Sequence, residues 1–268
     1  MSGSGSKLVI PLWESSQLAT LHWLTHGVTG RTGGVSPAPF DSLNLGLHVG
    51  DVPECVLENR TRLAASAGRS SPDQMVCAQQ VHGSHAAVVG PGQAGLGARS
   101  LQTALADADA LITAAPGLLL TLFFADCLPI FLVDPEHRVV SIAHAGWRGL
   151  VGGVIENTLQ TMTDRFGTRP ESLHAAIGPG IGACCFEVGG EVAARFPASV
   201  VTRGLQGSPT VHLAAAARLR LATAGVADHR IDSADICTAC STDRFFSHRA
   251  ENGKTGRMGG FIALRIAG

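Results

Sequence analysis

Hydrophobic residues along this chain fall mostly into short runs that are separated by glycine, proline and polar clusters. Runs of this length, rich in β-branched residues, are typical of buried strands. They predict strands at residues 7–13, 75–83, 86–90, 108–113, 117–125, 129–134, 139–145 and 174–180. Three other segments repeat their apolar residues at helical spacing. They predict helices at residues 52–68, 150–166 and 212–225.

The order of these elements indicates the fold class. Strand pairs that resemble hairpins, with separate helices between them, fit an α+β fold better than strict βαβ alternation. No internal repeat, low-complexity block or charge run divides the chain. We therefore predict one α+β domain. We expect its first helix to be capped by Asp51, to hold Pro53 in its first turn and to end at Gly68.

One predicted hairpin brings two reactive side chains together. The runs 129–134 and 139–145 are joined by a four-residue connection, which favours antiparallel pairing. If the paired numbers sum to 273, His144 and Cys127 project from one face, with backbones about 7–8 Å apart. A slip of one residue would separate them, and Pro129 favours an edge or a bulge, so the spacing alone leaves the pairing open.

A third candidate for the same site is His82, which follows an apolar strand and precedes a glycine. Two imidazoles and one thiolate suit a zinc ion whose fourth position stays open for water or substrate. Spacing alone does not join His82 to Cys127 and His144.

Charge and composition restrict the partners and the cell compartment that we expect for this protein. The formal net charge is −1 and basic residues form no run, so we expect no nucleic-acid partner. The longest apolar run, 115–133, is interrupted by Asp126 and two prolines, whereas a membrane span needs about 20 apolar residues. Seven cysteines without a secretory signal favour a reducing compartment. We expect a cytoplasmic monomer with no membrane partner.

Eight short motifs occur in one order, and together they resemble the YfiH/laccase-domain family from about Thr25 to the end of the chain. The motifs are SLNLGLHVGD (42–51), ENR (58–60), QQVHG (79–83), ADCLPI (125–130), HAGWRG (144–149), GPGIGACCFEVG (178–189), CTAC (237–240) and FFSHR (245–249).

This resemblance implies a fold, a metal site and an activity. The fold would be a single α+β domain of layered mixed sheets flanked by helices. Residues 25–268 would form the catalytic domain, after an N-terminal segment at 1–24. The polar start MSGSGSK by itself indicates a disordered tail at 1–7. The metal would be zinc, held by His82, Cys127 and His144. The activity would be purine nucleoside phosphorolysis, including cleavage of methylthioadenosine, with adenosine deamination beside it.

Phosphorolysis requires an anion site, and arginine suits phosphate because its fork pairs two oxygens. Arg60, Arg148 and Arg249 lie in the motifs of this family. We expect Arg60 to act in catalysis with Cys127 and His144. Substrate binding is expected from Asn44 as well as from the three arginines.

Two other enzyme classes remain open. Two histidines and a cysteine also suit copper, as in the polyphenol oxidase activity once described for this family. The chain has no HxH pair to hold further coppers, which argues against true laccase chemistry. A metal-free hydrolase would use Cys127 as nucleophile, His144 as base and Asp126 or another acid to orient the base. One description of the family assigns peptidoglycan-precursor editing. A non-enzymatic interaction module would use the metal only for stability.

The remaining cysteines carry weaker signals. A lone CTAC motif supplies half of a structural zinc site. We expect Cys184 and Cys185 to pack as small apolar residues.

Overall fold

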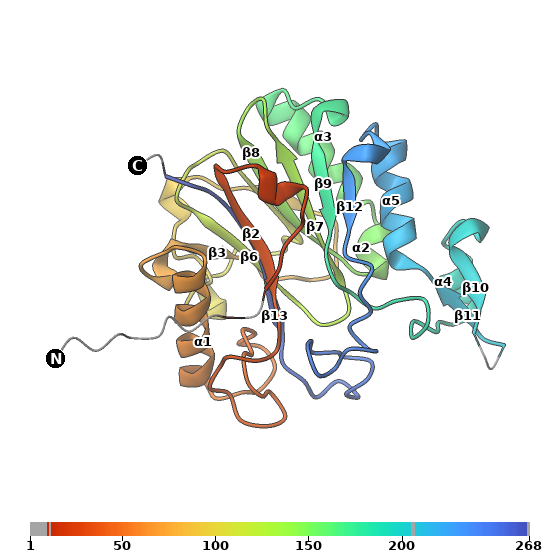
Figure 1. The fold of residues 1–268 in the computed structure, drawn as a ribbon, viewed down its shortest axis with the longest axis horizontal. Coiled ribbons are helices and arrows are strands. Elements are labelled where there is room, and N and C mark those ends of the chain that lie inside the picture. The colour runs from red at the N-terminus through yellow and green to blue at the C-terminus, as the bar shows by residue number, and fades with distance from the viewer. Residues whose placement is uncertain (1–9, 11, 205–206, 267–268) are drawn as a thin grey trace.

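The computed structural model describes residues 10, 12–204 and 207–266. Two mixed sheets pack face to face, and helices cover their outer faces (Figure 1). The five-stranded sheet has the order β1 (Leu12–Trp13), β2 (Leu24–Thr29), β13 (Met258–Leu264), β6 (Leu119–Phe124), β3 (Met75–Cys77). The six-stranded sheet has the order β12 (Ile231–Ser233), β9 (His174–Ile177), β7 (Leu128–Asp134), β8 (Val139–Ala145), β5 (Ala110–Thr113), β4 (Ala86–Val88). β10 (Val201–Arg203) and β11 (Pro209–Val211) form a separate two-stranded ribbon.

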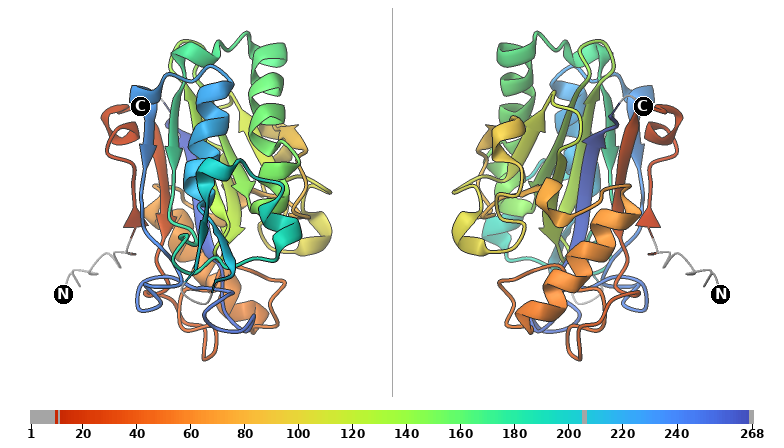
Figure 2. Two further views of the ribbon diagram at one scale, coloured as in Figure 1. Left: turned by 90° about the vertical axis from the view of Figure 1, so that its right-hand side faces the viewer. Right: turned by 90° about the vertical axis from the view of Figure 1, so that its left-hand side faces the viewer.

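The helices lie on opposite sides of the two sheets, as the two views of Figure 2 show. α1 (Pro53–Ser66) covers the five-stranded sheet. α2 (Trp147–Val151), α3 (Val154–Phe166) and α5 (Leu213–Thr223) cover the six-stranded sheet, and the short α4 (Gly190–Ala193) lies beside β11. The result confirms the predicted α+β domain of layered mixed sheets with flanking helices.

The strands of the middle layers read as continuous apolar runs because both of their faces are buried. In β7, Ile130 and Leu132 face the helices, whereas Phe131 and Val133 face the other sheet. All seven residues of β7 are buried. The sequence pattern therefore located these strands without showing which face meets which layer.

The predicted hairpin has the expected register. Asp134 pairs with Val139 and Pro129 pairs with His144 in the β7–β8 ladder. Pro129 is accommodated because the pairing of β7 with its other neighbour, β9, starts only at Ile130. Both predictions about this hairpin, its pairing and its common face for Cys127 and His144, are confirmed.

Several elements differ from the prediction. The sequence pattern did not predict β2 and β13, although these two strands pair side by side in the five-stranded sheet. β13 contains Gly259 and Gly260, which lowered its strand signal. A Cβ atom at Gly260 would lie 2.7 Å from the Phe124 ring in the same sheet and 3.0 Å from Cδ1 of Ile142 in the other sheet, so a glycine is required for close packing between the sheets.

The helix predicted at 150–166 is two helices. They are separated at Gly152 and Gly153, and Gly153 has a φ of 85°, which favours glycine. The N-cap of α1 is Val52 with no side-chain cap, so Asp51 does not have the predicted role. Asp51 instead accepts a hydrogen bond from the side chain of Asn44.

Two further predictions concern the chain ends and membranes. The predicted tail at 1–7 lies outside the described residues, and the division of the chain at residue 25 stays a prediction. Among the described residues, no helix has the length and apolarity needed to cross a membrane.

Candidate metal centre and adjoining cavity

The structure brings His82, Cys127 and His144 together, and we call these residues the pocket trio. One ligand atom from each lies within 4.8 Å of the others. Cys127 directly precedes β7, and His144 lies near the end of β8. His82 comes from the loop between β3 and β4, and its ring centroid is 4.9 Å from that of His144. This donor set fits a single metal ion with one position open towards solvent.

Asp109 orients the pocket trio, and the sequence analysis missed it. Its fully buried carboxylate lies 2.8 Å from Nδ1 of His144. A carboxylate at this distance accepts the Nδ1 proton, so Nε2 is left to bind a metal. The same carboxylate accepts backbone N–H bonds from Val81, His82 and Gly83. The sequence signal for Asp109 was an acidic residue near the start of the apolar run 108–113.

Asp126, the acid expected to orient a histidine, has other partners. Its carboxylate accepts hydrogen bonds from the hydroxyls of Thr238 and Ser247 and from the backbone N–H of Arg249. Thr238 and Ser247 both lie in the connection between β12 and β13, so Asp126 ties that connection at two points to the start of β7.

Cys127 and His144 form an electrostatic pair. Burial disfavours the Cys127 thiolate, but His144 and His82 together lower its pKa to about 6. Burial likewise disfavours the His144 imidazolium, but Cys127 and Asp109 raise the pKa of His144 to about 9. Near neutral pH the metal-free pair is therefore a Cys127 thiolate beside a His144 imidazolium, and a metal ion would displace the Nε2 proton of His144 as it binds.

The backbone around the pocket trio is strained. His82 has a φ of 60° and Asp126 a φ of 84°, values that L-residues rarely adopt. Gly146 has no side chain to obstruct the site, since a Cβ atom there would lie 2.7 Å from Sγ of Cys127. Two turns and one close approach thus set the positions of the ligands.

The pocket trio opens into a cavity of about 620 Å³. This volume is within the range of small-molecule sites. The cavity is lined by His48, Ala78, Gln79, Gln80, His82, Leu101, Phe123, Ala125, Asp126, Cys127, His144, Gly146, Trp147, Arg148, Ile181, Phe186, His248, Arg249 and Arg257. Among these described lining residues, Asp126 is the one carboxylate beside three arginines.

The three lining arginines give the cavity its positive charge. Arg148 lies over the Trp147 ring, 4.4 Å from its centroid. Arg249 donates from Nη1 to the carbonyls of Cys185 and Glu187. Arg257, which the sequence analysis missed, donates from Nη1 to the carbonyls of Thr255 and Gly256.

Arg60 lies outside this cavity. Its side chain is fully buried and donates to the carbonyls of Leu45, Gly97 and Ala98. The guanidinium also lies over the Phe123 ring, 4.4 Å from its centroid, and burial lowers its pKa. These contacts favour a structural role, and the predicted phosphate role of Arg60 has no support from its position.

Asn44 is also buried outside the cavity. Its side-chain oxygen accepts the backbone N–H groups of Gly46 and Arg257. Asn44 therefore positions Arg257 rather than contacting a ligand in the cavity.

His48 and Gln80 line the cavity but were not among the predicted site residues. Burial, aided by the charge of Arg257, lowers the pKa of His48 to about 4, so its ring is neutral near pH 7. Gln80 exchanges two hydrogen bonds with the backbone of Phe123, which fixes one wall. His48 lies in the motif at 42–51, which was the signal available for it.

Comparisons with known proteins identify relatives of this chain. A family model described as multi-copper polyphenol oxidoreductase laccase matches residues 25–265. The chain is 40% identical over 246 residues to a purine nucleoside phosphorylase YlmD from Geobacillus stearothermophilus, covering 89% of each chain. It is 38% identical over 266 residues to the purine nucleoside phosphorylase YfiH of Escherichia coli, covering 97% of this chain and 99% of that one.

A solved structure gives the same result for the fold. The crystal structure of YlmD from Geobacillus stearothermophilus matches with a TM-score of 0.89 and 36% identity. The match covers 96% of this chain and 100% of the other.

Proposed function

The chain belongs to the YfiH/laccase-domain family, and from this membership we propose that it is a zinc-dependent purine nucleoside phosphorylase. Its substrates would be adenosine, inosine and methylthioadenosine, cleaved with phosphate to the free base and the ribose 1-phosphate. One observation carries the proposal: the pocket trio opens into a cavity that also holds three arginines and aromatic side chains.

Zinc suits the pocket trio on the chemistry of its donors. Two imidazoles and a thiolate are ligands that zinc prefers, and Asp109 sets the tautomer of one of them. When bound, zinc supplies a Lewis acid at the floor of the cavity. Copper accepts the same donors and is the alternative metal.

The arginines support the phosphate half of the reaction. In phosphorolysis an oxygen of phosphate bonds to C1′ while the purine leaves with the electrons of the C1′–N9 bond. Arg148, Arg249 and Arg257 line one cavity and would hold the phosphate and offset its charge. Of these, Arg148 and Arg249 were expected from the sequence, and Arg257 replaces Arg60 in the proposal.

The walls of the cavity support binding of the purine base. Phe123, Trp147 and Phe186 offer apolar surface for a purine ring, and Gln79 and His48 offer polar contacts. Adenosine deamination is a second activity that we propose for the same cavity. Three protein ligands with an open position are the arrangement that zinc deaminases use.

The setting we propose is a cytoplasmic monomer in which residues 25–268 form the catalytic domain. All seven cysteines are free, which suits a reducing compartment. Size-exclusion chromatography with light scattering tests the oligomeric state.

The test of the activity is release of hypoxanthine from inosine, measured by liquid chromatography with and without phosphate. We expect phosphate-dependent release that stops when a chelator removes the metal. Arg249→Met should raise the KM for phosphate, whereas the control Arg218→Met, in a surface ion pair with Asp228, should not. Cleavage that is independent of phosphate would contradict phosphorolysis, and catechol oxidation after copper loading would favour the oxidase.

The Cys–His hydrolase is separated from the phosphorylase by the metal. Its support is the Cys127–His144 pair with its lowered thiol pKa. A metal-stripped protein that keeps full activity, and loses it on alkylation of Cys127, would establish the hydrolase.

A further inference from the structure

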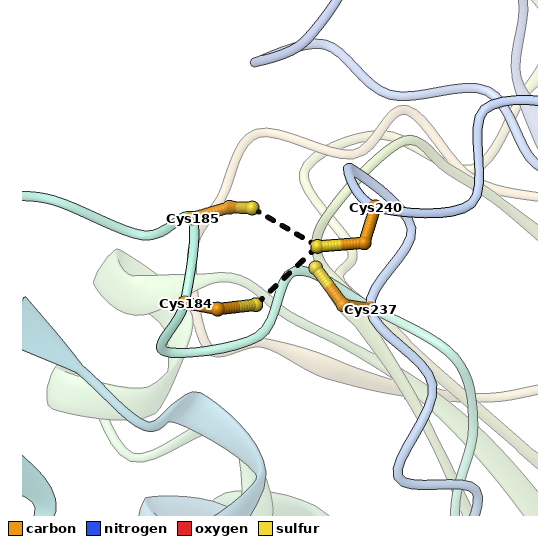
Figure 3. Close-up of side chains that lie close together, drawn as sticks. All are labelled: Cys184, Cys185, Cys237 and Cys240. Atoms are coloured by element: carbon orange, nitrogen blue, oxygen red, sulfur yellow. Dashed lines mark hydrogen bonds between the residues drawn. The ribbon is translucent and has the colours of Figure 1, made fainter.

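Four cysteines outside the pocket trio converge on one point, although they come from two distant segments. Cys184 and Cys185 lie in the loop after β9, and Cys237 and Cys240 lie in the loop after β12. Figure 3 shows their side chains pointing towards one another. We call these four residues the four-cysteine cluster.

The sulfur positions match a tetrahedral metal shell. All four sulfurs lie within 4.8 Å of one another, and Sγ of Cys240 is 3.3 Å from Cys185 and 3.5 Å from Cys184. A tetrahedral zinc ion with Zn–S bonds of about 2.3 Å has sulfurs about 3.8 Å apart. Both separations from Cys240 are slightly shorter than that value, and no pair of these sulfurs is more than 4.8 Å apart.

We propose that Cys184, Cys185, Cys237 and Cys240 bind a second metal ion, a structural zinc held by four thiolates. The CTAC motif has the spacing of a zinc half-site, and the adjacent pair Cys184 and Cys185 supplies the other half. The expectation that this pair packs as small apolar residues is wrong for Cys184, whose side chain is exposed.

The backbone prepares this site before any ion binds. Gly180 and Cys237 form a parallel bridge, which joins the two loops next to the sulfurs. Gly182 donates its backbone N–H to Sγ of Cys237 at 3.2 Å, a contact that favours a thiolate. A Cβ atom on Gly182 would lie 3.1 Å from Cβ of Cys237 and 3.2 Å from Sγ of Cys184, so glycine allows the close approach.

The arrangement fits a metal ion better than disulfides. A disulfide joins sulfurs in pairs, whereas Sγ of Cys240 here lies at similar distances from the sulfurs of Cys184 and Cys185. Cys184 and Cys240 are exposed, which leaves a path for an ion to enter. Four ligands would close the coordination shell, so this site would hold structure rather than bind a substrate.

The position of the cluster gives it a role in the nucleoside cavity. Ile181 and Phe186 flank the Cys184–Cys185 pair and line that cavity. Thr238, inside the CTAC motif, donates to Asp126 next to Cys127. A metal ion in the cluster would therefore fix one wall of the cavity by joining the 178–189 loop to the 234–249 segment.

The test is metal analysis of four proteins purified without chelator, combined with X-ray absorption at the zinc edge. We expect about two zinc ions per wild-type chain, and about one in Cys127→Ala. We also expect about one in the Cys184→Ser/Cys240→Ser double variant. The control Cys55→Ser, a cysteine outside both sites, should keep two.

X-ray absorption of Cys127→Ala makes the result independent of whether the double variant folds. We expect a shell of four sulfurs at about 2.3 Å in that protein. A shell with nitrogen ligands, or a Cys127→Ala protein without metal, would overturn the proposal. So would fewer than seven free thiols in the denatured, chelated wild type, which would show a disulfide. None of these readouts depends on enzymatic activity, so a failed phosphorylase assay does not affect them.

Discussion

The pocket trio and the four-cysteine cluster differ in how much of a metal's coordination shell they fill. The trio offers three ligands, an oriented histidine and an opening into a cavity of about 620 Å³. The cluster offers four sulfurs from two loops joined by a backbone bridge. A zinc site with an open coordination position is typical of catalysis, whereas one with four protein ligands is typical of a structural role. We therefore propose a catalytic role for the trio and a stabilising role for the cluster.

The largest expected effect on turnover comes from removing Cys127, the thiolate ligand of the pocket trio. Cys127→Ala should lower turnover by on the order of 10³-fold, because several kcal/mol of transition-state stabilisation depend on the metal. The purified variant should keep the metal of the four-cysteine cluster. Steady-state kinetics and metal analysis check both parts, and a variant that retains full turnover would remove the trio from the mechanism.

A smaller effect is expected from the residue that orients the trio. Asp109→Asn keeps the size of the side chain but weakens its bond to Nδ1 of His144. We expect the zinc affinity of the trio to fall about 10- to 100-fold, since outer partners of ligands have effects of this size. Competition with a chromogenic chelator measures it. The matched control Asp126→Asn should keep the zinc affinity within a few-fold of the wild-type value. Equal losses of affinity in the two variants would contradict the assignment of Asp109 as the residue that orients His144.

In the metal-stripped protein, Cys127 and Cys184 should differ in how their reaction with a thiol reagent depends on pH. His144 lowers the pKa of Cys127 to about 6, whereas burial and the neighbouring thiols raise the pKa of Cys184 to about 11. A lowered pKa means that the thiolate is present above pH 6 and is lost as the pH falls below it. The rate of Cys127 alkylation by iodoacetamide should therefore level off above about pH 7, whereas the rate of Cys184 should keep rising about tenfold per pH unit. Mass spectrometry of the labelled peptides measures both pH profiles, and a Cys127 rate that still rises about tenfold per unit above about pH 8 would contradict the electrostatics.

The two regions also differ in how far the sequence predicted them. Cys127 and His144 were placed together because hairpin pairing has a period of two, so one assumed pair fixes the others. Asp109, Arg257 and the cluster lie where separate loops meet, and no period along the chain connects Cys185 with Cys240. The fold class followed from apolar runs, but β13 was missed because it contains Gly259 and Gly260. These glycines allow close packing on the two faces of the strand, which a pattern along the chain does not show.

A variant of Arg60, the arginine expected from the sequence to bind phosphate, tests whether this residue stabilises the fold or binds substrate. Arg60→Met removes donors to the buried carbonyls of Leu45, Gly97 and Ala98. We expect the free energy of unfolding to fall by about 2–3 kcal/mol, because unpaired buried carbonyls are costly. Urea unfolding measures it, and the KM for phosphate should stay near the wild-type value. A raised KM with unchanged stability would restore Arg60 as a phosphate ligand.

The smallest expected effect concerns the hydroxyl that joins the two regions. Thr238→Val removes the hydrogen bond from the cluster loop to Asp126 and keeps the side-chain shape. Ser247 donates to the same carboxylate oxygen, so that oxygen stays partnered. We expect a loss of about 1 kcal/mol in stability and a rise of a few-fold in the KM for inosine, with both metals retained. The control Thr161→Val, whose hydroxyl bonds only within α3, should change neither. If Thr238→Val instead leaves the KM unchanged, the cluster stabilises the fold without shaping the cavity.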